Sequence, residues 1–377
     1  MAEPSILDRG AHRPSVERPS PSANSAAFED FLATRHLPGL DGLRCLAILP
    51  VVWHHSTPRL LPGVLGKGAV GVDLFFALSG FLITTLLLRE RRARGRISLS
   101  AFFARRSLRI FPLYYAVLGL YTVRALLMPE GSPSAAHFLR SLPYHATYTA
   151  NWLVDYAVPH DVIFAFSWSL CVEEQFYWVW PFLVALVPSR MLLALAMLVA
   201  IAIDHHAEHA GFASFAPPGS TLLRMLTSFA TPIGFGSLAA LLLDTPRGFA
   251  LARHALGWRA SAPLLLLASI ALLALPATPY LSLSLCLAAL VASVALRRDN
   301  GLGWLLELRA VRWVGAVSYA LYLVHITAIG LIKRFWPEAR EHALWVFALA
   351  LPFSLLLAYA AHRLIERPFQ ALRSRFQ

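Results

Sequence analysis

The sequence is poor in charged residues and in cysteine. Asp, Glu, Lys and Arg make up 14% of its 377 residues and hydrophobic residues 57%, whereas a soluble domain keeps roughly a quarter of its residues charged. This shortage excludes an ordinary soluble domain. Cys45, Cys171 and Cys286 lie in apolar runs without disulfide or metal spacing. We interpret them as small core residues and expect no metal site.

The N-terminal segment lacks the apolar core of a cleaved signal peptide. Residues 1–36 are polar and rich in Pro, Ser and Ala, which predicts a disordered tail. The runs that follow are long enough to cross about 30 Å of hydrocarbon. We therefore predict an all-α, polytopic integral membrane protein with about ten transmembrane helices. The predicted spans are residues 39–58, 68–88, 107–128, 162–187, 190–204, 221–243, 261–276, 280–296, 313–332 and 342–364.

Negative charge is scarcer than positive charge, and the formal net charge is +12. The basic residues lie between the apolar runs rather than on a soluble face, so no nucleic-acid partner is expected. With the N-terminus inside, the inner segments carry 24 Lys and Arg residues and the outer segments carry 8. The positive-inside rule then predicts that both termini are cytoplasmic. The basic cluster at residues 89–106 is also typical of a segment that contacts anionic membrane lipids.

The first predicted span contains an arginine and a histidine on one helical face. Arg44 and His55 are eleven residues apart, which corresponds to three turns plus about 20° and to about 16 Å along the axis. His54 lies roughly 80° from that face. Ionisable side chains inside a span are costly and are therefore functional candidates. The alternative interpretation is a snorkelling arginine and an interfacial histidine.

The second predicted span begins with an acidic residue and contains a pair of small residues. Asp73 lies near its outer start, and Ser79 and Gly80 follow in the middle of the span. Small residues at such positions allow helices to pack closely, which is the structural alternative to a role in binding.

The fourth predicted span contains two adjacent glutamates in "SWSLCVEEQFYWVWP". Adjacent side chains do not share a helix face. Glu173 aligns at i±4 with Ser169 and Tyr177, which can hydrogen-bond it, whereas Glu174 aligns with apolar neighbours. Glu173 is therefore the predicted inward-facing carboxylate.

The sequence "GAVSYALYLVH" adds further polar residues in the ninth predicted span, namely Ser318, Tyr322 and His325. Tyr322 and His325 are i, i+3 neighbours on one face, although His325 could equally be a core histidine with its hydrogen bonds satisfied.

The polar residues near the outer side predict a cluster of His55, Asp73 and Glu173, with Arg44 between this cluster and the basic inner side. An imidazole near a carboxylate is typical of a general base with an orienting partner. A basic inner mouth suits a phosphorylated donor from the cytoplasm.

Six motifs in a fixed order resemble those of a known family. They are "LDGLRCLAILPVVWHH", "GVDLFFALSGFLITT", "FFARRSLRIFPLYY", "FSWSLCVEEQFYWVWP", "GAVSYALYLVH" and "LIERPF". Together they cover residues 40–369, and on them the chain resembles acyltransferase family 3, a family of multi-pass membrane O-acyltransferases. The resemblance implies a transmembrane acyltransferase domain over residues 37–369, between cytoplasmic tails at 1–36 and 370–377, in a bacterial-type inner (plasma) membrane.

The resemblance also implies an activity. The expected reaction moves an acyl group, often acetyl, from cytoplasmic acyl-CoA to a hydroxyl of a glycan, a lipid-linked glycan or a small acceptor. The family's Arg and His pair falls on Arg44 and His55, and its span-four glutamate falls on Glu173. Its RxxR motif falls on Arg106 and Arg109, with Arg105 beside them, and is expected to bind the coenzyme A phosphates. The further substrate or structural candidates are Ser79, Tyr177, Ser318, Tyr322 and His325.

Several alternatives stay open at the level of sequence. Larger family members carry an esterase-like domain after the membrane part, and since none follows here we expect no second transfer step by such a domain. His55 is expected to deprotonate the acceptor, but a covalent acyl intermediate on His55 or Ser79 is an alternative. A glycolipid or small-molecule transporter or flippase would also place Arg44 and Glu173 in a membrane, although no inverted repeat is visible. The acceptor and the oligomeric state are not determined.

Overall fold

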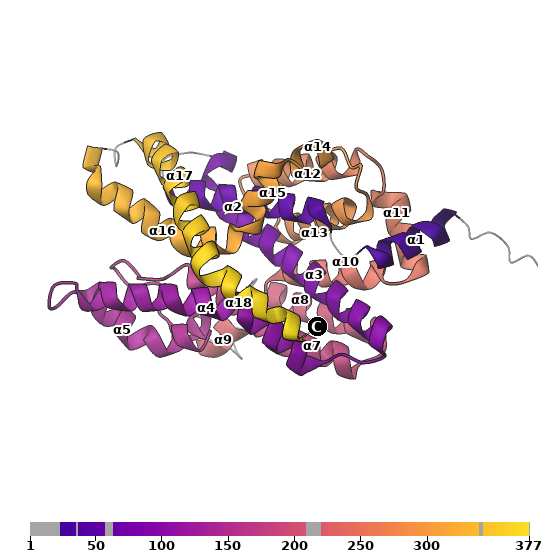
Figure 1. Ribbon diagram of the computed structural model, residues 1–377, viewed down its shortest axis with the longest axis horizontal. Coiled ribbons are helices and arrows are strands. Elements are labelled where there is room, and N and C mark those ends of the chain that lie inside the picture. The colour runs from indigo at the N-terminus through magenta and orange to yellow at the C-terminus, as the bar shows by residue number, and fades with distance from the viewer. Residues whose placement is uncertain (1–22, 35–36, 57–62, 209–219, 339–341, 377) are drawn as a thin grey trace, which may run out of the picture.

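The protein is an all-helical assembly in a computed structural model that describes residues 23–34, 37–56, 63–208, 220–338 and 342–376. Figure 1 shows its helices arranged side by side along the long axis of the molecule. The longer helices are α2 Pro38–Ser56, α3 Gly71–Arg94, α4 Leu99–Leu126, α5 Pro133–Ala146, α7 Ser167–Leu186, α8 Arg190–Glu208, α10 Thr231–Leu243, α12 Ser261–Ala274, α13 Tyr280–Leu296, α16 Ser318–Phe335 and α17 Ala343–Ala361. The shorter ones are α1 Ala23–Ala33, α6 Ala150–Leu153, α9 Thr221–Leu226, α11 Pro246–Leu256, α14 Gly303–Leu306, α15 Arg309–Ala316 and α18 Arg367–Ala371.

The all-α class is confirmed, and the helices agree with a membrane protein. Within the described ranges, four helical segments are long and apolar enough to cross a membrane, and there are up to six if each bent pair is one span. The four are Gly68–Arg94, Arg190–Ala207, Thr221–Leu243 and Leu344–Phe376. The bent pairs are α11 with α12, at 72°, and α15 with α16, at 76°. Helices do occupy all ten predicted positions, but the count of about ten crossings stays a prediction.

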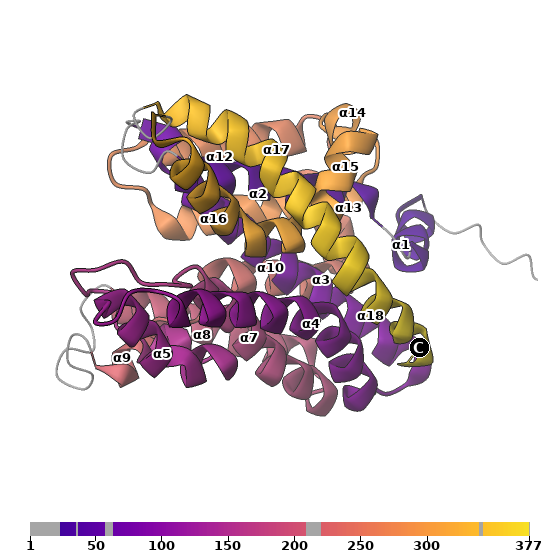
Figure 2. The same cartoon turned by 60° about the vertical axis from the view of Figure 1, so that its left-hand side comes forward.

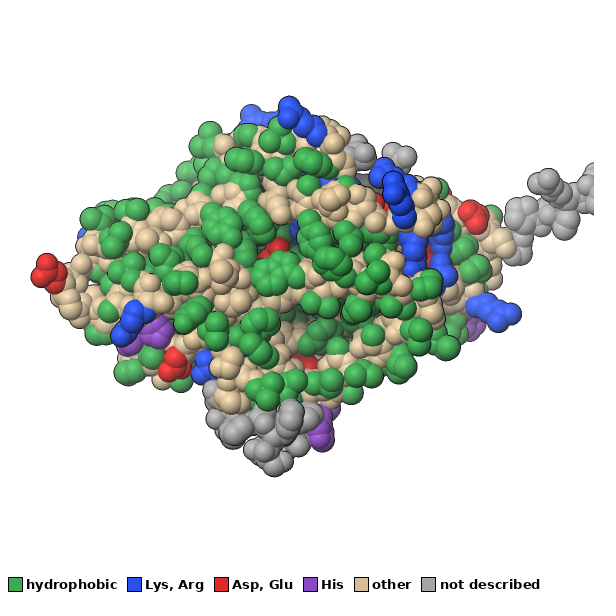
Figure 3. Space-filling view, turned by 90° about the horizontal axis from the view of Figure 1, so that it is seen from below, with side chains coloured by type: hydrophobic (Ala, Val, Ile, Leu, Met, Phe, Trp, Pro, Cys, Tyr) green, Lys and Arg blue, Asp and Glu red, His purple; other side chains and the backbone are tan. Residues whose placement is uncertain are grey.

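The helices form two layers around a central pair. Figure 2 shows α4, α5, α7, α8 and α9 in one layer and α2, α12, α13, α15, α16 and α17 in the other, with α3 and α10 between them. In Figure 3 hydrophobic side chains cover the middle of the surface, and several Lys and Arg side chains gather toward the end where α1 lies in Figure 1. This distribution agrees in kind with an apolar belt and a basic rim.

The predicted disordered tail needs a correction. Residues 23–33 form α1, whose Phe28 and Phe31 are buried and pack on Phe249 of α11 at ring-centroid distances of 5.3 and 5.4 Å. The guanidinium groups of Arg89 and Arg92 lie over the same two Phe rings of α1. Aromatic burial and cation–π contacts order this segment despite its polar composition. Residues 1–22 and 35–36 of the predicted tail lie outside the described ranges.

The central pair α3 and α10 crosses at two glycines. A Cβ on Gly80 would collide with the carbonyl oxygen of Ile233, and one on Gly236 with the carbonyl oxygen of Ala77. Each helix therefore places a glycine against the backbone of the other, which is the close approach that small residues permit. The packing interpretation of Gly80 is thus confirmed.

Gly80→Ala is expected to destabilise the protein by about 1–3 kcal/mol, because a methyl group at the crossing forces the helices apart. The matched control is Gly119→Ala in α4, where a Cβ would meet nothing within 4 Å. This control should be neutral or stabilising by about 0.5–1 kcal/mol, since alanine favours a helix over glycine. Thermal unfolding of the purified chain in detergent measures both, and equal midpoints for the two variants would contradict the crossing.

Candidate active site

A cavity of about 320 Å³ lies between α2, α3, α4, α7 and α16, and we call it the arginine-lined cavity. On α3 its lining runs from Val72 to Arg89, which is about 26 Å of helix and close to the roughly 30 Å of a hydrocarbon core. Seven of the predicted site residues line it, namely Arg44, Ser79, Arg106, Arg109, Glu173, Ser318 and Tyr322. Its lining does not include His55, Asp73, Arg105, Tyr177 or His325.

Four arginines line this cavity, and the three that were predicted as site residues differ in their contacts. Arg44 forms an ion pair of 2.6 Å with Asp41, three residues earlier on α2, and this partner was missed at the level of sequence. The Arg106 guanidinium lies 3.7 Å from the ring centroid of Tyr177. The Arg109 side chain makes no hydrogen bond or ion pair within the part of the chain that the structure describes. Arg106 and Arg109 are thus the arginines available to an anion in the cavity.

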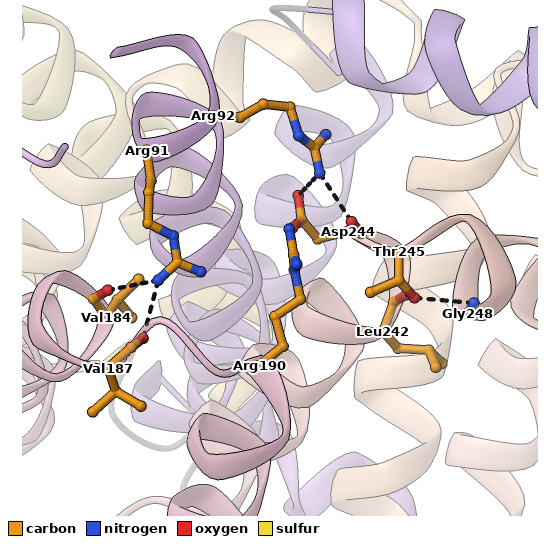
Figure 4. Close-up of polar contacts among 9 residues, drawn as sticks. All are labelled: Arg91, Arg92, Val184, Val187, Arg190, Leu242, Asp244, Thr245 and Gly248. Carbon is orange, nitrogen blue, oxygen red and sulfur yellow. Dashed lines mark hydrogen bonds and ion pairs between the residues drawn. The ribbon is translucent and has the colours of Figure 1, made fainter. Parts of the chain in front are cut away.

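The neighbouring arginines are engaged elsewhere. Asp244, which is buried at the end of α10, accepts from Arg92 of α3 at 2.8 Å and from Arg190 of α8 at 2.7 Å (Figure 4). Arg91 donates to the carbonyl groups of Val184 and Val187 at the end of α7. These contacts join neighbouring ends of α3, α7, α8 and α10.

Arg89 and Arg105 also have protein partners. Arg89, which lines the cavity, donates to the carbonyl groups of Phe31 and Thr34 beside α1. Arg105 pairs with Glu90 at 3.0 Å and donates to the carbonyl of Phe376. The structure therefore does not bring Arg105 together with Arg106 and Arg109 in the cavity.

Glu173 lies in the cavity, as expected, but its partner differs from the expected one. The Ser79 hydroxyl of α3 donates to the Glu173 carboxylate at 2.5 Å. Ser169 instead hydrogen-bonds Tyr322 at 2.6 Å. The Tyr177 hydroxyl is buried without a hydrogen-bond partner in the described ranges. Helical alignment alone could not find Ser79, because it belongs to another helix.

Glu174 is a site residue that the periodicity argument missed. It also lines the cavity, it is 4% exposed, and its Oε1 atom has no hydrogen-bond partner among the residues described. Consecutive residues point about 100° apart on a helix. Both carboxylates can therefore line one cavity when that cavity extends over about 100° of the α7 surface.

His55 lies beside a second histidine at the far end of α2. Its Nδ1 atom is 2.9 Å from the Val51 carbonyl oxygen and 3.2 Å from Nε2 of His325 on α16. His325 is fully buried, and its Nδ1 atom is 2.6 Å from the carbonyl oxygen of Tyr322. His55 and His325, two predicted site residues, are therefore within hydrogen-bond distance of each other. His325 also contacts the main chain of Tyr322, which lines the cavity.

With both rings neutral, the carbonyl partners indicate one tautomer for each histidine. A carbonyl oxygen can only accept, so the Nδ1 atom of His325 carries a proton and the Nε2 atom of the neutral ring accepts. The proton shared with His55 therefore belongs to Nδ1 of His55, which donates to Val51 and to His325. The Nε2 atom of His55 then holds a lone pair, which is the state that a general base requires.

Asp73 and His54 have partners of their own. The Tyr280 hydroxyl of α13 donates to Asp73 at 3.0 Å. His54 is 3.0 Å from the Gly66 carbonyl oxygen, and its ring stands edge-on to that of His55. No hydrogen bond joins Asp73 or Glu173 to His55 among those of the described residues, so the expected orientation of His55 by one of these carboxylates stays a prediction.

The segment 129–161, between α4 and α7, contains α5 and α6. Its His137 and His160 approach to 3.3 Å between Nδ1 and Nε2. Partial burial and the nearby His160 and Arg140 lower the pKa of His137. The described residues contain no group of three or more His, Cys, Asp or Glu side chains that could hold a metal ion.

The family assignment follows from a comparison with known proteins. The profile of a family described as an acyltransferase domain matches residues 37–363, which include the arginine-lined cavity and the histidine pair. The chain belongs to acyltransferase family 3. No solved structure matches the chain.

Relatives of this acyltransferase family 3 chain are named as O-acetyltransferases. It is 26% identical over 372 residues to "Putative O-acetyltransferase SACOL0978" of Staphylococcus aureus (strain COL), covering 91% of this chain and 59% of that protein. It is 29% identical over 366 residues to "Putative peptidoglycan O-acetyltransferase YrhL" of Bacillus subtilis, covering 89% and 55%. It is 32% identical over 170 residues to "O-acetyltransferase OatA" of Staphylococcus aureus, covering 43% and 27%. The chain thus spans less than two thirds of the length of each of these relatives.

Asp244→Ala is expected to lower the free energy of unfolding by about 1–3 kcal/mol, because Arg92 and Arg190 lose the buried carboxylate that joins α3 and α8 to α10. Thermal unfolding in detergent provides the measurement. Asp299→Ala is the control, since Asp299 is exposed and its ion pair is with Arg297, two residues earlier. An unchanged midpoint for Asp244→Ala would show that the ion pairs do not hold these helices.

Proposed function

We propose that the chain transfers an acetyl group from acetyl-CoA to a hydroxyl group of a glycan at the outer side of the bacterial inner membrane. The observation that carries this proposal is the arginine-lined cavity. It joins Arg106 and Arg109 to the Ser79–Glu173 pair and to Tyr322 in one space. The proposal also takes both termini as cytoplasmic, so that the basic end of the cavity faces the donor.

Acetyl-CoA is a donor that suits this space. Its phosphates would bind Arg106 and Arg109, which are positioned to form charge-assisted hydrogen bonds. Its thin pantetheine arm would follow the apolar lining of Phe75, Leu82 and Ile83 on α3. A volume of about 320 Å³ suits the pantetheine arm. The nucleotide of acetyl-CoA would then stay at the end of the cavity near Arg106 and Arg109. Arg44, held by Asp41, adds positive charge beside the path of the arm.

His55 would act as the general base. Its Nε2 lone pair takes the proton of the acceptor hydroxyl while the oxygen attacks the thioester carbonyl. The new C–O bond forms, the C–S bond breaks, and the proton passes from His55 to the leaving thiolate. His325 and the Val51 carbonyl position the ring through Nδ1. Ser79 would serve as the oxyanion donor by turning its hydroxyl proton from Glu173 to the thioester oxygen.

The glycan acceptor is proposed from the relatives. One of them is named for peptidoglycan, so we propose a polymer of N-acetylhexosamines as the acceptor of this chain. Such a polymer lies outside the cytoplasm, which agrees with the position of His55 at the end of α2 opposite to Arg44.

His55→Ala is expected to lower kcat for acetyl transfer by about 10²–10⁴-fold, because a positioned base contributes that much. His54→Ala is the matched control. It loses the contact with the Gly66 carbonyl but leaves Nε2 of His55 in place, so its loss should be much smaller. Acetyl transfer by the purified chain in proteoliposomes, followed by mass spectrometry, measures both. Equal losses would contradict the role of His55.

The double variant Arg106→Ala and Arg109→Ala should raise the KM for acetyl-CoA by about 10–100-fold, because charge-assisted hydrogen bonds to the phosphates are lost. Arg105→Ala, whose side chain binds Glu90 and Phe376, should leave this KM nearly unchanged. Steady-state kinetics with acetyl-CoA as the varied substrate gives the comparison. An unchanged KM in the double variant would return Arg106 and Arg109 to a role in lipid contact.

A further inference from the structure

A second cavity, of about 350 Å³, lies next to the first and is used by none of the steps above. Phe76 of α3 lines both cavities, and α7 also borders both, with Glu173 toward the first and Val172 toward the second. Phe76 is therefore a wall that the two spaces share. We call the second space the aromatic cavity.

Aromatic side chains make up much of its lining, namely Phe76, Tyr156, Trp168, Phe229 and Tyr280. They come from α3, α7, α13 and the connections before α7 and α10. Trp168 is 42% exposed and meets the ring of Phe76 edge-on at 6.1 Å between centroids. An exposed indole beside a cavity offers a flat apolar surface, which is what the C–H face of a sugar ring stacks against.

Polar groups are held in place around the same cavity. Asn151 and Gln175 form a reciprocal amide pair, with bonds of 3.1 and 2.8 Å. Arg224 donates to the carbonyl of Val154 at 2.9 Å. The Ser228 hydroxyl accepts from Trp152 at 2.8 Å. Because these side chains are already fixed by protein contacts, little conformational entropy is lost when a ligand binds them.

The lining includes a tyrosine hydroxyl whose hydrogen-bonding capacity is not met by the described residues. The Tyr156 hydroxyl is buried and makes no hydrogen bond within the described ranges. A buried hydroxyl left without a partner costs about 1–3 kcal/mol. A ligand hydroxyl or amide in the cavity would remove that cost.

The aromatic cavity is also connected to the predicted catalytic region. Tyr280, which lines it, donates to Asp73. The lining of the arginine-lined cavity includes Phe76, which the two cavities share, and Tyr322, whose carbonyl oxygen contacts His325. A sugar in the aromatic cavity would therefore lie beside the end of the donor path that is remote from Arg89.

We propose that the aromatic cavity is the acceptor subsite and binds one N-acetylhexosamine unit of the glycan, with the ring stacked on Trp168 and a hydroxyl or amide hydrogen-bonded to Tyr156. The cavity has aromatic rings in its lining, amide and hydroxyl groups held by protein contacts, and a volume of about 350 Å³. These properties suit a small polar ligand with one apolar face. This assignment rests on the proposed acetyl transfer to a glycan.

The test uses the full chain in lipid nanodiscs and chitotetraose as the probe. Equilibrium binding of fluorescein-labelled chitotetraose is measured without acetyl-CoA, and acetyl transfer to unlabelled chitotetraose is measured separately by mass spectrometry. Trp168→Ala should raise both the Kd and the KM for chitotetraose about tenfold. Tyr156→Phe should raise them about fivefold, and neither variant should raise the KM for acetyl-CoA.

Matched controls are Trp345→Ala and Tyr359→Phe on α17, whose side chains are 62% and 43% exposed and line neither cavity. Normal binding by Trp168→Ala and Tyr156→Phe, or absence of binding by the unmodified chain, would overturn the subsite. Binding that both variants weaken, without any acetyl transfer by the unmodified chain, would support the subsite and overturn the proposed function.

Discussion

A charged side chain inside hydrocarbon must find a partner or face a polar space, and the arrangement of this molecule follows from that requirement. The arginines of α3 meet carbonyl groups at the ends of α1 and α7 and the carboxylate of Asp244. Arg44 meets Asp41. Arg106 and Arg109 line the cavity and form no ion pair with a carboxylate among the described residues. The same requirement that pairs the arginines at the helix ends thus leaves two arginine side chains of α4 for the donor phosphates that we propose.

Individual helices were predictable from the sequence because an apolar run is a local signal. The runs at 39–58 and 68–88 correspond closely to α2 and α3. Prediction from local composition failed for segments whose structure depends on contacts with residues distant in the sequence. The polar segment 23–33 is helical because two of its phenylalanines reach Phe249, which lies more than 200 residues away in the chain. The run at 221–243 is divided between α9 and α10, a break that hydropathy does not show.

The identity of the candidate site residues was more predictable than their pairing. Arg44, Arg106, Arg109 and Glu173 do share one cavity. Their partners come from elsewhere: Ser79 bonds Glu173 from 94 residues away, and His325 reaches His55 from 270 residues away. Helical periodicity relates residues on one helix only, so it selected the face of each helix but not the neighbour opposite. Asp41 is the exception, since an i, i+3 rule would have found it.

The crossing of α3 and α10 gives the cavity a fixed side. Main chain rests on main chain at Gly80 and Gly236, and Ser79 belongs to the same turn as Gly80. The main chain of Ser79 is therefore positioned by the contact of two backbones, and its hydroxyl by the hydrogen bond to Glu173. Other side chains of the lining could differ without moving this main chain. The glycine crossing thus positions main chain beside the cavity independently of the side chains that give the cavity its shape.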